Sequence, residues 1–152
     1  MTLRPHRLTR HGGFTLVELV LVVTIIAILA GAVVVQATNR TRMARRARAL
    51  EDIRNLDMAI ELYIADNGYS PTTQQGLDAL RRKPTSAPAA RNWSGPYIRK
   101  PVPSDPWGNE YIYRSPAQQN PDREGWDLIT YGEDGQPGGI DYAADITNFE
   151  SE

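Results

Sequence analysis

The sequence contains no cysteine and only two histidines, and these gaps exclude several kinds of chemistry. Without cysteine the chain forms no disulfide, has no thiol nucleophile and offers no thiolate to zinc or to an iron–sulfur cluster. His6 and His11 both precede a long apolar run, so the body of the chain has no histidine for a catalytic triad or a metal site. A soluble part of about a hundred residues would therefore gain stability from a non-cysteine metal site or from neighbouring subunits.

The net charge of −1 hides an uneven distribution along the chain. Three arginines precede the apolar run, five follow it (Arg40, Arg42, Arg45, Arg46 and Arg48), and neither Lys nor Arg occurs from Glu124 to the end. Loss of residues 1–13 would leave 14 basic against 18 acidic residues, a net charge of −4. Because no basic face with interleaved aromatic residues is present, we expect no nucleic-acid binding.

Residues 14–37 form an apolar run in which Glu18 and Gln36 are the only strongly polar side chains. A helix over this run would be roughly 36 Å long, enough to cross a hydrocarbon core of about 30 Å. A secretory signal peptide has a shorter apolar core that ends at a small-residue cleavage site. Here Ala30-Gly31-Ala32 lies inside the run, so the sequence predicts one membrane-spanning helix over residues 14–37.

Glu18 is the unusual residue of this segment, because a carboxylate in a membrane costs about 2.5 to 3.5 kcal/mol near the centre. One interpretation is that its side chain reaches back to the membrane interface. The other is a cationic partner. If the chain is cut after Gly13, Phe14 gains a free ammonium group within about one helical turn of Glu18, or of the Glu18 of a neighbouring copy.

Residues Gly13 to Glu18 resemble the N-terminal signal of type IV pilins and pseudopilins, a basic leader that ends in Gly before Phe-Thr-Leu-x-Glu. The resemblance implies that a membrane prepilin peptidase cuts after Gly13 and methylates the amine of Phe14. It further implies that Glu18 neutralises the terminal amine of another subunit during assembly. The N-terminus would then be cytoplasmic and the head periplasmic, although the arginines after the run favour the opposite orientation by the positive-inside rule.

No proline occurs between Phe14 and Asp66, and Gly31 is the single glycine, so one helix is predicted to continue far beyond the membrane. An amphipathic stripe recurs every three or four residues at Leu50, Ile53, Leu56, Ile60, Tyr63 and Ile64. Asn67-Gly68 is typical of a helix end.

The predicted parts are a leader (1–13), a membrane or filament-core helix (14–37) and a head (38–152) whose amphipathic helix ends at about 66. The arginine cluster indicates a solvated face, or a contact with lipid headgroups or adjacent subunits.

The rest of the head indicates a small antiparallel sheet. Residues 73–83 are predicted to hold a short helix carrying Leu77 and Leu80, residues 84–96 a loop, and residues 103–109 a turn. Residues 111–114 and 126–131 look like two paired strands. The predicted fold class is α+β, a long helix packed on a small antiparallel sheet.

Five blocks of the head, in order, resemble the major pseudopilin of type II secretion systems. They are residues 70–77, 93–97, 105–111, 132–139 and 144–146. The resemblance implies a type IV pilin-like fold and a structural, non-enzymatic subunit. It would polymerise into a periplasmic filament that drives export of folded proteins across the outer membrane. Implied partners are further copies, minor pseudopilins, an inner-membrane assembly platform and the prepilin peptidase. A type IV pilin or a minor pseudopilin is the alternative, although major pilins usually close a C-terminal loop with a disulfide.

Residues 131–145 combine four acids with four glycines and a proline, and contain no Lys or Arg. Hard oxygen ligands on a tight loop suit Ca²⁺, which takes six to eight oxygens, but the spacing is not that of an EF-hand. The residues alone leave a solvated acidic turn equally open. The resemblance implies one calcium ion, held by carboxylates of Asp134 and Asp141 and by main-chain oxygens of Tyr131, Glu133 and Gln136. Glu133 departs from the small residue expected there, and Asp145 is a lesser candidate.

A membrane-anchored periplasmic hydrolase is the alternative from another class. Its catalytic groups would have to be carboxylates near turns or strands, namely Asp105, Asp122, Glu124 and Asp127. None of them has a nearby histidine or a nucleophile motif in the sequence, so an enzyme is not expected.

Overall fold

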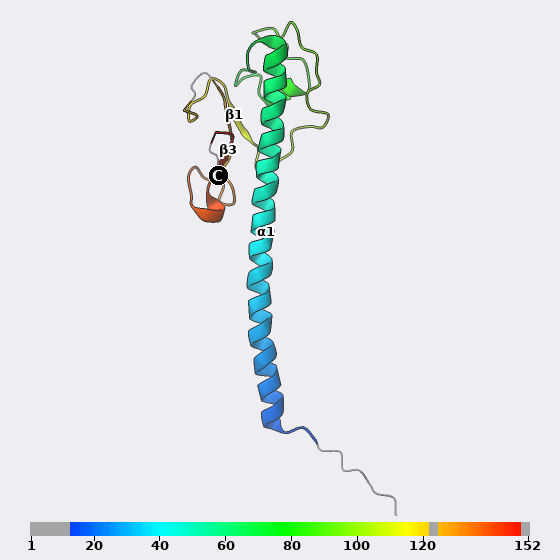
Figure 1. The fold of residues 1–152 in the computed structure, drawn as a ribbon, viewed down its shortest axis with the longest axis vertical. Coiled ribbons are helices and arrows are strands. Elements are labelled where there is room, and N and C mark those ends of the chain that lie inside the picture. Colours follow the sequence, from blue (N-terminus) through cyan, green and yellow to red (C-terminus); the bar gives the residue numbers. More distant parts are fainter. Residues whose placement is uncertain (1–12, 122–124, 150–152) are drawn as a thin grey trace, which may run out of the picture. The chain divides into compact units, whose positions relative to one another are not determined.

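The computed structural model describes residues 13–121 and 125–149, and of residues 31–37 only the backbone (Figure 1). The chain divides into two compact units, Met1–Arg40 and Thr41–Glu152. The predicted leader, apart from Gly13, lies outside the described residues. Asp122 and Glu124, two carboxylates of the hydrolase alternative, lie outside them as well.

The dominant element is the helix α1, which runs from Leu16 to Asn67 over 52 residues. Its start is capped reciprocally, because the Glu18 N–H donates to Thr15 Oγ1 (3.2 Å) and the Thr15 N–H donates to the Glu18 carboxylate (3.5 Å). Its end is fixed by Gly68, whose φ of 81° a glycine adopts at little cost and whose N–H donates to the Ile64 carbonyl at 2.7 Å. The predicted continuous helix and its end near residue 66 are confirmed.

The large apolar side chains at the beginning of α1 are exposed, from 45% at Val22 to 78% at Leu16. Among the described residues, no helical stretch has both the length and the hydropathy that crossing a membrane requires. The side chains of residues 31–37, which belong to the predicted span, lie outside the described residues. The span over residues 14–37 stays a prediction.

Three short strands form one antiparallel sheet in the order β1-β2-β3. They are β1 (Ile112–Arg114), β2 (Asp127–Thr130) and β3 (Ile146–Thr147). Ile112 pairs with Ile129, and Thr130 pairs with Ile146. The buried strand β2 is therefore central and pairs with both edge strands, β1 and β3. Figure 1 shows the sheet beside the C-terminal half of α1. The predicted pair β1–β2 is confirmed, whereas β3 was not predicted because two residues carry no readable alternation.

The core lies between α1 and the sheet. On the helix, Ile53, Leu56, Ile60 and Tyr63 are at most 4% exposed, and Leu50 and Ile64 pack at the margin, so the predicted stripe is confirmed. Leu80, Leu128 and Ile146 join the same cluster. Because full burial of a large apolar side chain contributes about 1.5 to 3 kcal/mol, this stripe holds the sheet on α1.

The predicted helix over residues 73–83 is wrong in length. A single 3₁₀ turn, η1 (Leu77–Leu80), occupies its centre. Before it, the side chains of Thr72 and Gln75 each bond the backbone N–H of the other, and Gly76 has a φ of 61°. These local bonds and the left-handed glycine replace the first turn of an α-helix. A second 3₁₀ turn, η2 (Asp141–Ala143), was not predicted.

Candidate functional site

Of the first predicted functional pair, Phe14 lies just before α1 and Glu18 in its first turn, and both are exposed. The carboxylate of Glu18 takes part in the capping of its own helix, a role that the sequence interpretation missed. The signal was present, because Thr15-x-x-Glu18 is the pattern of a capping box. Glu18 therefore has a local structural role besides the two roles considered from the sequence.

The loop of residues 131–145, here the C-terminal loop, turns back tightly on itself. Gly132, Gly135, Gly138 and Gly139 have φ between 66° and 94°, and Asp141 has a φ of 54° without being a glycine. A Cβ on Gly139 would lie 2.3 Å from the Ala143 carbonyl oxygen. Side chains at these glycines would be strained, so the glycines fix the path of the loop.

The acids of the C-terminal loop are spread along it. Asp134 and Asp141 are exposed, and Asp134 Oδ1 accepts the Gln136 N–H at 3.1 Å. Asp145 Oδ2 accepts the Gly138 N–H at 2.9 Å, while Asp145 Oδ1 is buried without a hydrogen-bond partner. Among the described residues, no group of three or more acidic side chains is placed to hold a metal ion. The predicted site needs only two carboxylates beside main-chain oxygens, so the calcium site stays a prediction.

Two arginines of α1 hold the C-terminal loop, a contact that the sequence interpretation missed. Arg42 Nε lies 3.1 Å from Glu133 Oε1, and its guanidinium lies 5.8 Å from the ring centroid of Tyr142. Arg46 donates to the Ala144 carbonyl at 2.9 Å. These two side chains face their own head rather than only solvent, lipid or another subunit. Nothing in the sequence linked them to residues about ninety positions away.

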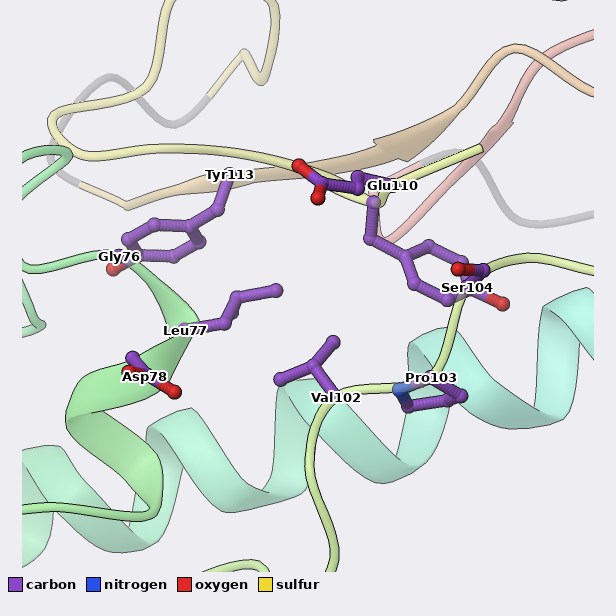
Figure 2. Close-up of a pocket in the computed structure, with 9 residues that line it drawn as sticks. Gly76, Leu77, Asp78, Val102, Pro103, Ser104, Glu110 and Tyr113 are labelled. Atoms are coloured by element: carbon purple, nitrogen blue, oxygen red, sulfur yellow. The ribbon is translucent and has the colours of Figure 1, made fainter. Parts of the chain in front are cut away.

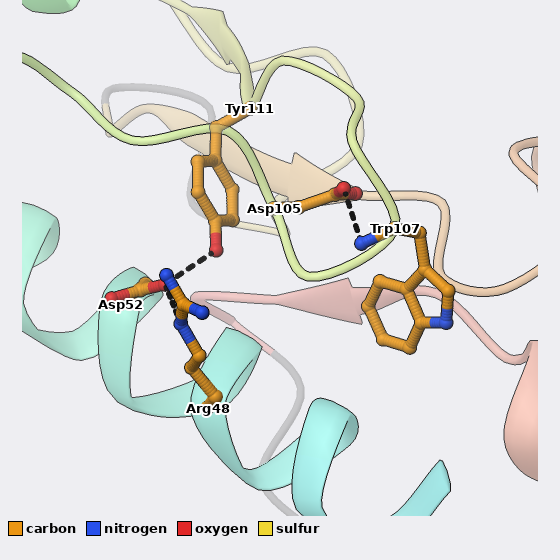
Figure 3. Close-up of polar contacts among 5 residues, drawn as sticks. All are labelled: Arg48, Asp52, Asp105, Trp107 and Tyr111. Carbon is orange, nitrogen blue, oxygen red and sulfur yellow. Dashed lines mark hydrogen bonds and ion pairs between the residues drawn. The ribbon is translucent and has the colours of Figure 1, made fainter. Parts of the chain in front are cut away.

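Asp105 is a buried carboxylate that shapes the turn of residues 103–109. It accepts the backbone N–H groups of Trp107 (3.0 Å) and Asn109 (2.8 Å) and the hydroxyl of Thr130 (2.5 Å). Figure 3 shows the bond from Trp107 to Asp105 and, near it, the Arg48–Asp52–Tyr111 chain, in which the Tyr111 hydroxyl donates to Asp52 at 3.1 Å. Both carboxylate oxygens of Asp105 accept hydrogen bonds from the turn or from β2, so Asp105 joins the turn to the sheet.

Asp127 is fully buried on β2 and accepts three consecutive backbone N–H groups, from Gln118, Gln119 and Asn120, at 2.8 to 3.2 Å. Burial alone would raise the pKa of Asp127, but the three donors favour the charged form and hold the pKa below its usual value. Asp127 thus joins the segment before β2 to the sheet.

A groove of about 410 Å³ opens between η1 and the segment leading into β1 (Figure 2). Its floor is apolar, with Leu77, Tyr111 and Tyr113, and Asp78 and Glu110 stand on its rim. Ser104 also lines the groove, but no histidine or lysine that could activate its hydroxyl is among the lining residues. The lining therefore favours a contact surface over a catalytic site.

Two family models match adjacent parts of the chain. The model described as "Type II secretion system (T2SS), protein G" matches residues 36–149, and the "Prokaryotic N-terminal methylation motif" matches residues 8–34. The chain belongs to the type II secretion system protein G family. Members of this family are structural pseudopilin subunits and not enzymes.

Known relatives of this pseudopilin agree over nearly the whole chain. Type II secretion system core protein G of Pseudomonas aeruginosa is 42% identical over 142 residues, 93% of this chain and 97% of that protein. The protein of the same name from Vibrio cholerae is 43% identical over 144 residues, 94% of each chain. The crystal structure of the major pseudopilin from the type 2 secretion system of enterohaemorrhagic Escherichia coli superposes with a TM-score of 0.60. It is 35% identical and covers 74% of this chain and 92% of that chain.

The predicted pilin-like fold and the predicted role as major pseudopilin are therefore confirmed, and the hydrolase alternative is wrong. Two of its four carboxylates, Asp105 and Asp127, are buried in this pseudopilin and bonded to its own backbone.

Proposed function

We propose that this pseudopilin polymerises through its N-terminal helix into a periplasmic filament that drives the export of folded proteins across the outer membrane. The observation that carries the proposal is the order of the two family matches. The methylation motif ends at residue 34 and the head model begins at residue 36, so processing signal and head follow one another in one chain with a single residue between the matches. Minor pseudopilins and an inner-membrane assembly platform are the further partners of this proposal.

Processing by a prepilin peptidase is the first step that the chain's own residues support. Gly13 and Phe14 precede α1, and Phe14 is 83% exposed. Cleavage between them would leave the amine of Phe14, which the same enzyme would methylate, one residue before the helix cap at Thr15. Before assembly, the apolar residues 14–37 would anchor the subunit once in the inner membrane, with the N-terminus cytoplasmic and the head periplasmic.

Glu18 would guide assembly by pairing with the Phe14 amine of another subunit. Its carboxylate now bonds the Thr15 N–H at 3.5 Å, a long hydrogen bond that leaves accepting capacity on both oxygens. In an apolar filament core, an unpaired carboxylate is costly, and a neighbouring ammonium offsets that cost. The capping geometry supports this role, because it holds the side chain at the first turn, near the chain end that cleavage would create.

A calcium ion in the C-terminal loop is the second component of the proposal. Two observations support the fit of the residues. Asp145 Oδ1 is buried without a partner, and no hydrogen bond within the described residues ends on the carbonyl oxygen of Tyr131, Glu133 or Gln136. Asp134 and Asp141 would supply carboxylates, and these carbonyls the main-chain oxygens, a donor set of the kind that Ca²⁺ prefers. The ion's charge would offset the acids of a loop that has no Lys or Arg.

The decisive experiment is mass spectrometry of the N-terminus of the protein extracted from membranes of a host with a type II secretion system. We expect a mature chain that begins with N-methyl-Phe14 and is recovered in sheared filaments. An uncut chain that begins at Met1, or a chain cut within residues 30–37, would refute the proposed function.

A further inference from the structure

A second, apolar groove lies between α1 and the C-terminal loop. It has a volume of about 330 Å³ and is lined by Met43, Arg46, Ala47, Leu50 and Tyr142, here the α1 groove. Met43 is 60% exposed although its side chain is large and apolar. Because three of the five lining residues recur along one face of the helix, at positions 43, 47 and 50, the groove presents an apolar strip to a partner.

The C-terminal loop carries an apolar side chain that its own head does not cover. Ile140 is 79% exposed, more than any other large apolar side chain among the described residues of the unit Thr41–Glu152. It lies between the glycine pair 138–139, where a Cβ on Gly139 would clash with the Ala143 carbonyl, and the turn η2. Ile140 therefore projects from a tightly folded part of the loop.

The charges around the groove and around Ile140 are complementary. Residues 41–54 of α1 hold five arginines and two acids, whereas the C-terminal loop holds four acids and no Lys or Arg. Within the head, Glu133 is paired with Arg42, but Asp134 and Asp141 on either side of the tip are exposed. Arg46 lines the α1 groove itself. An acidic loop with an apolar tip and a basic helix with an apolar groove thus stand on the same chain.

The proposed pairing of Glu18 with Phe14 fixes how far neighbouring copies are shifted along the filament axis. If Glu18 of one copy pairs with the Phe14 amine of the next, the copies are shifted along the filament by about one helical turn, roughly 6 Å. Every copy in a filament is equivalent, so the heads are shifted by the same amount. The α1 groove and the C-terminal loop lie at nearly the same height along the axis of α1, because Arg42 and Arg46 bind the loop beside helix positions 43–50. A small axial shift between two copies therefore brings the loop of one copy near the groove of the other. A contact between two different surfaces can also repeat along an open helix, as a filament requires.

We propose that the tip of the C-terminal loop of one copy docks into the α1 groove of the next copy, with Ile140 against Met43, Ala47 and Leu50. The inference rests on the proposed filament function and names a head contact that stabilises it. The loop has four acids and no Lys or Arg, so it stays net negative even beside the divalent ion of the proposed calcium site. It therefore meets the arginine-rich face of the neighbouring α1 favourably, which orients the loop tip and disfavours loop-to-loop contacts.

Cysteine cross-linking tests the contact directly, because the chain has no cysteine of its own. Ala47→Cys and Ile140→Cys are introduced into separate full-length chains with different tags, which are expressed together and oxidised in intact cells. We expect a disulfide dimer that carries both tags. The control replaces Ile140→Cys by Ser104→Cys, an exposed position at the other groove, and should give no such dimer. A single chain with Ala47→Cys and Ile140→Cys should give a ladder of dimers, trimers and larger species.

Filaments that form normally but give no mixed dimer between positions 47 and 140 would overturn the inference and leave the proposed function intact. Dimers from Ile140→Cys alone, without the mixed product, would overturn it as well, since the loops would then meet each other. Failure of the unmodified chain to form filaments would instead refute the proposed function, on which the inference depends.

Substitution of Ile140 gives an independent measurement. Ile140→Gln keeps the size of the side chain and adds no charge to the loop, so we expect filament recovery to fall roughly tenfold or more. The melting temperature of the head should not change, because the side chain is exposed in the subunit. Ile140→Leu is the matched control and should assemble normally. Normal assembly of Ile140→Gln would contradict the contact, and a melting temperature lowered together with assembly would assign Ile140 to the fold instead.

Discussion

Asp127 offers the sharpest test of how this head is held together without a disulfide. The variant Asp127→Asn preserves the shape of the side chain but replaces one acceptor oxygen by an NH₂ group. In the native head both carboxylate oxygens face the backbone N–H groups of Gln118, Gln119 and Asn120. In the variant, the NH₂ group of the amide would face backbone N–H groups, which are also donors, in a fully buried site.

The size of the effect follows from these bonds. Hydrogen bonds to a charged group contribute about 1.5 to 3 kcal/mol, and an unsatisfied buried donor costs about 1 to 3 kcal/mol. Loss of one or two of the four contacts therefore lowers the free energy of unfolding by about 3 kcal/mol. For a head of this size we expect the melting temperature to fall by about 10 to 20 °C.

Tryptophan fluorescence is the suitable assay, because Trp93, Trp107 and Trp126 all belong to the head and the full chain can be melted in detergent. Asp78→Asn is the matched control, since Asp78 is an exposed acid, and it should change the free energy of unfolding by less than about 0.5 kcal/mol. A melting temperature of Asp127→Asn within about 2 °C of the unmodified chain would refute this role of Asp127.

The pH dependence of the same comparison has a defined sign. The pKa of Asp127 is lower in the folded head than its usual value, so the unfolded chain binds a proton there more readily. The stabilisation is therefore fully present above about pH 4 and is lost as the pH falls through the lowered folded value. We expect the difference in melting temperature between the unmodified chain and Asp127→Asn to narrow in acid, and a difference that widens there would contradict the argument.

Three further predictions concern the proposed function. Gly13→Leu should leave the precursor uncut, and a chain of mature mass from this variant would contradict cleavage at that bond. Glu18→Val and Glu18→Gln should both give processed, membrane-held subunits without filaments; because glutamine preserves the capping box, normal filaments from Glu18→Gln would mean that the cap, and not the charge, is what assembly needs. Calcium at a hundred times Kd should stabilise the head by about 2.7 kcal/mol and raise its melting temperature by about 10 °C or more. Asp134→Asn should lose that shift and magnesium should not reproduce it, whereas equal melting in calcium and in chelator would show a solvated acidic turn.

Much of α1 could be predicted because its determinants are local and periodic. The absence of proline, the spacing of Ile53, Leu56, Ile60 and Tyr63, and the pair Asn67-Gly68 each act within one or two helical turns. The same is true of Gly13, Phe14 and Glu18, which form a contiguous motif. The capping box at Thr15 and Glu18 was equally local, and it was missed because only the charge of Glu18 was considered.

The predictions for the C-terminal loop were less complete. Its glycines and acids were recognised, but Asp145 was ranked below Asp134 and Asp141, because the sequence does not show that its Oδ1 is buried without a partner. The strand β3 follows the loop and consists of two residues, and it forms because Thr130 and Ile129 offer a free edge of β2. A strand of this length has no alternation of its own to reveal it.

The sequence by itself therefore determined the long helix, its buried face, the processing signal and the family, since each depends on neighbours in the chain. Only the tertiary structure decided which polar groups meet. Arg42 reaches Glu133 across 91 positions, and Arg46 reaches Ala144 across 98. Whether an arginine faces solvent or a distant carbonyl depends on where the sheet places the C-terminal loop. Burial of the apolar core determines the position of the loop, because a single surface ion pair contributes too little free energy to do so.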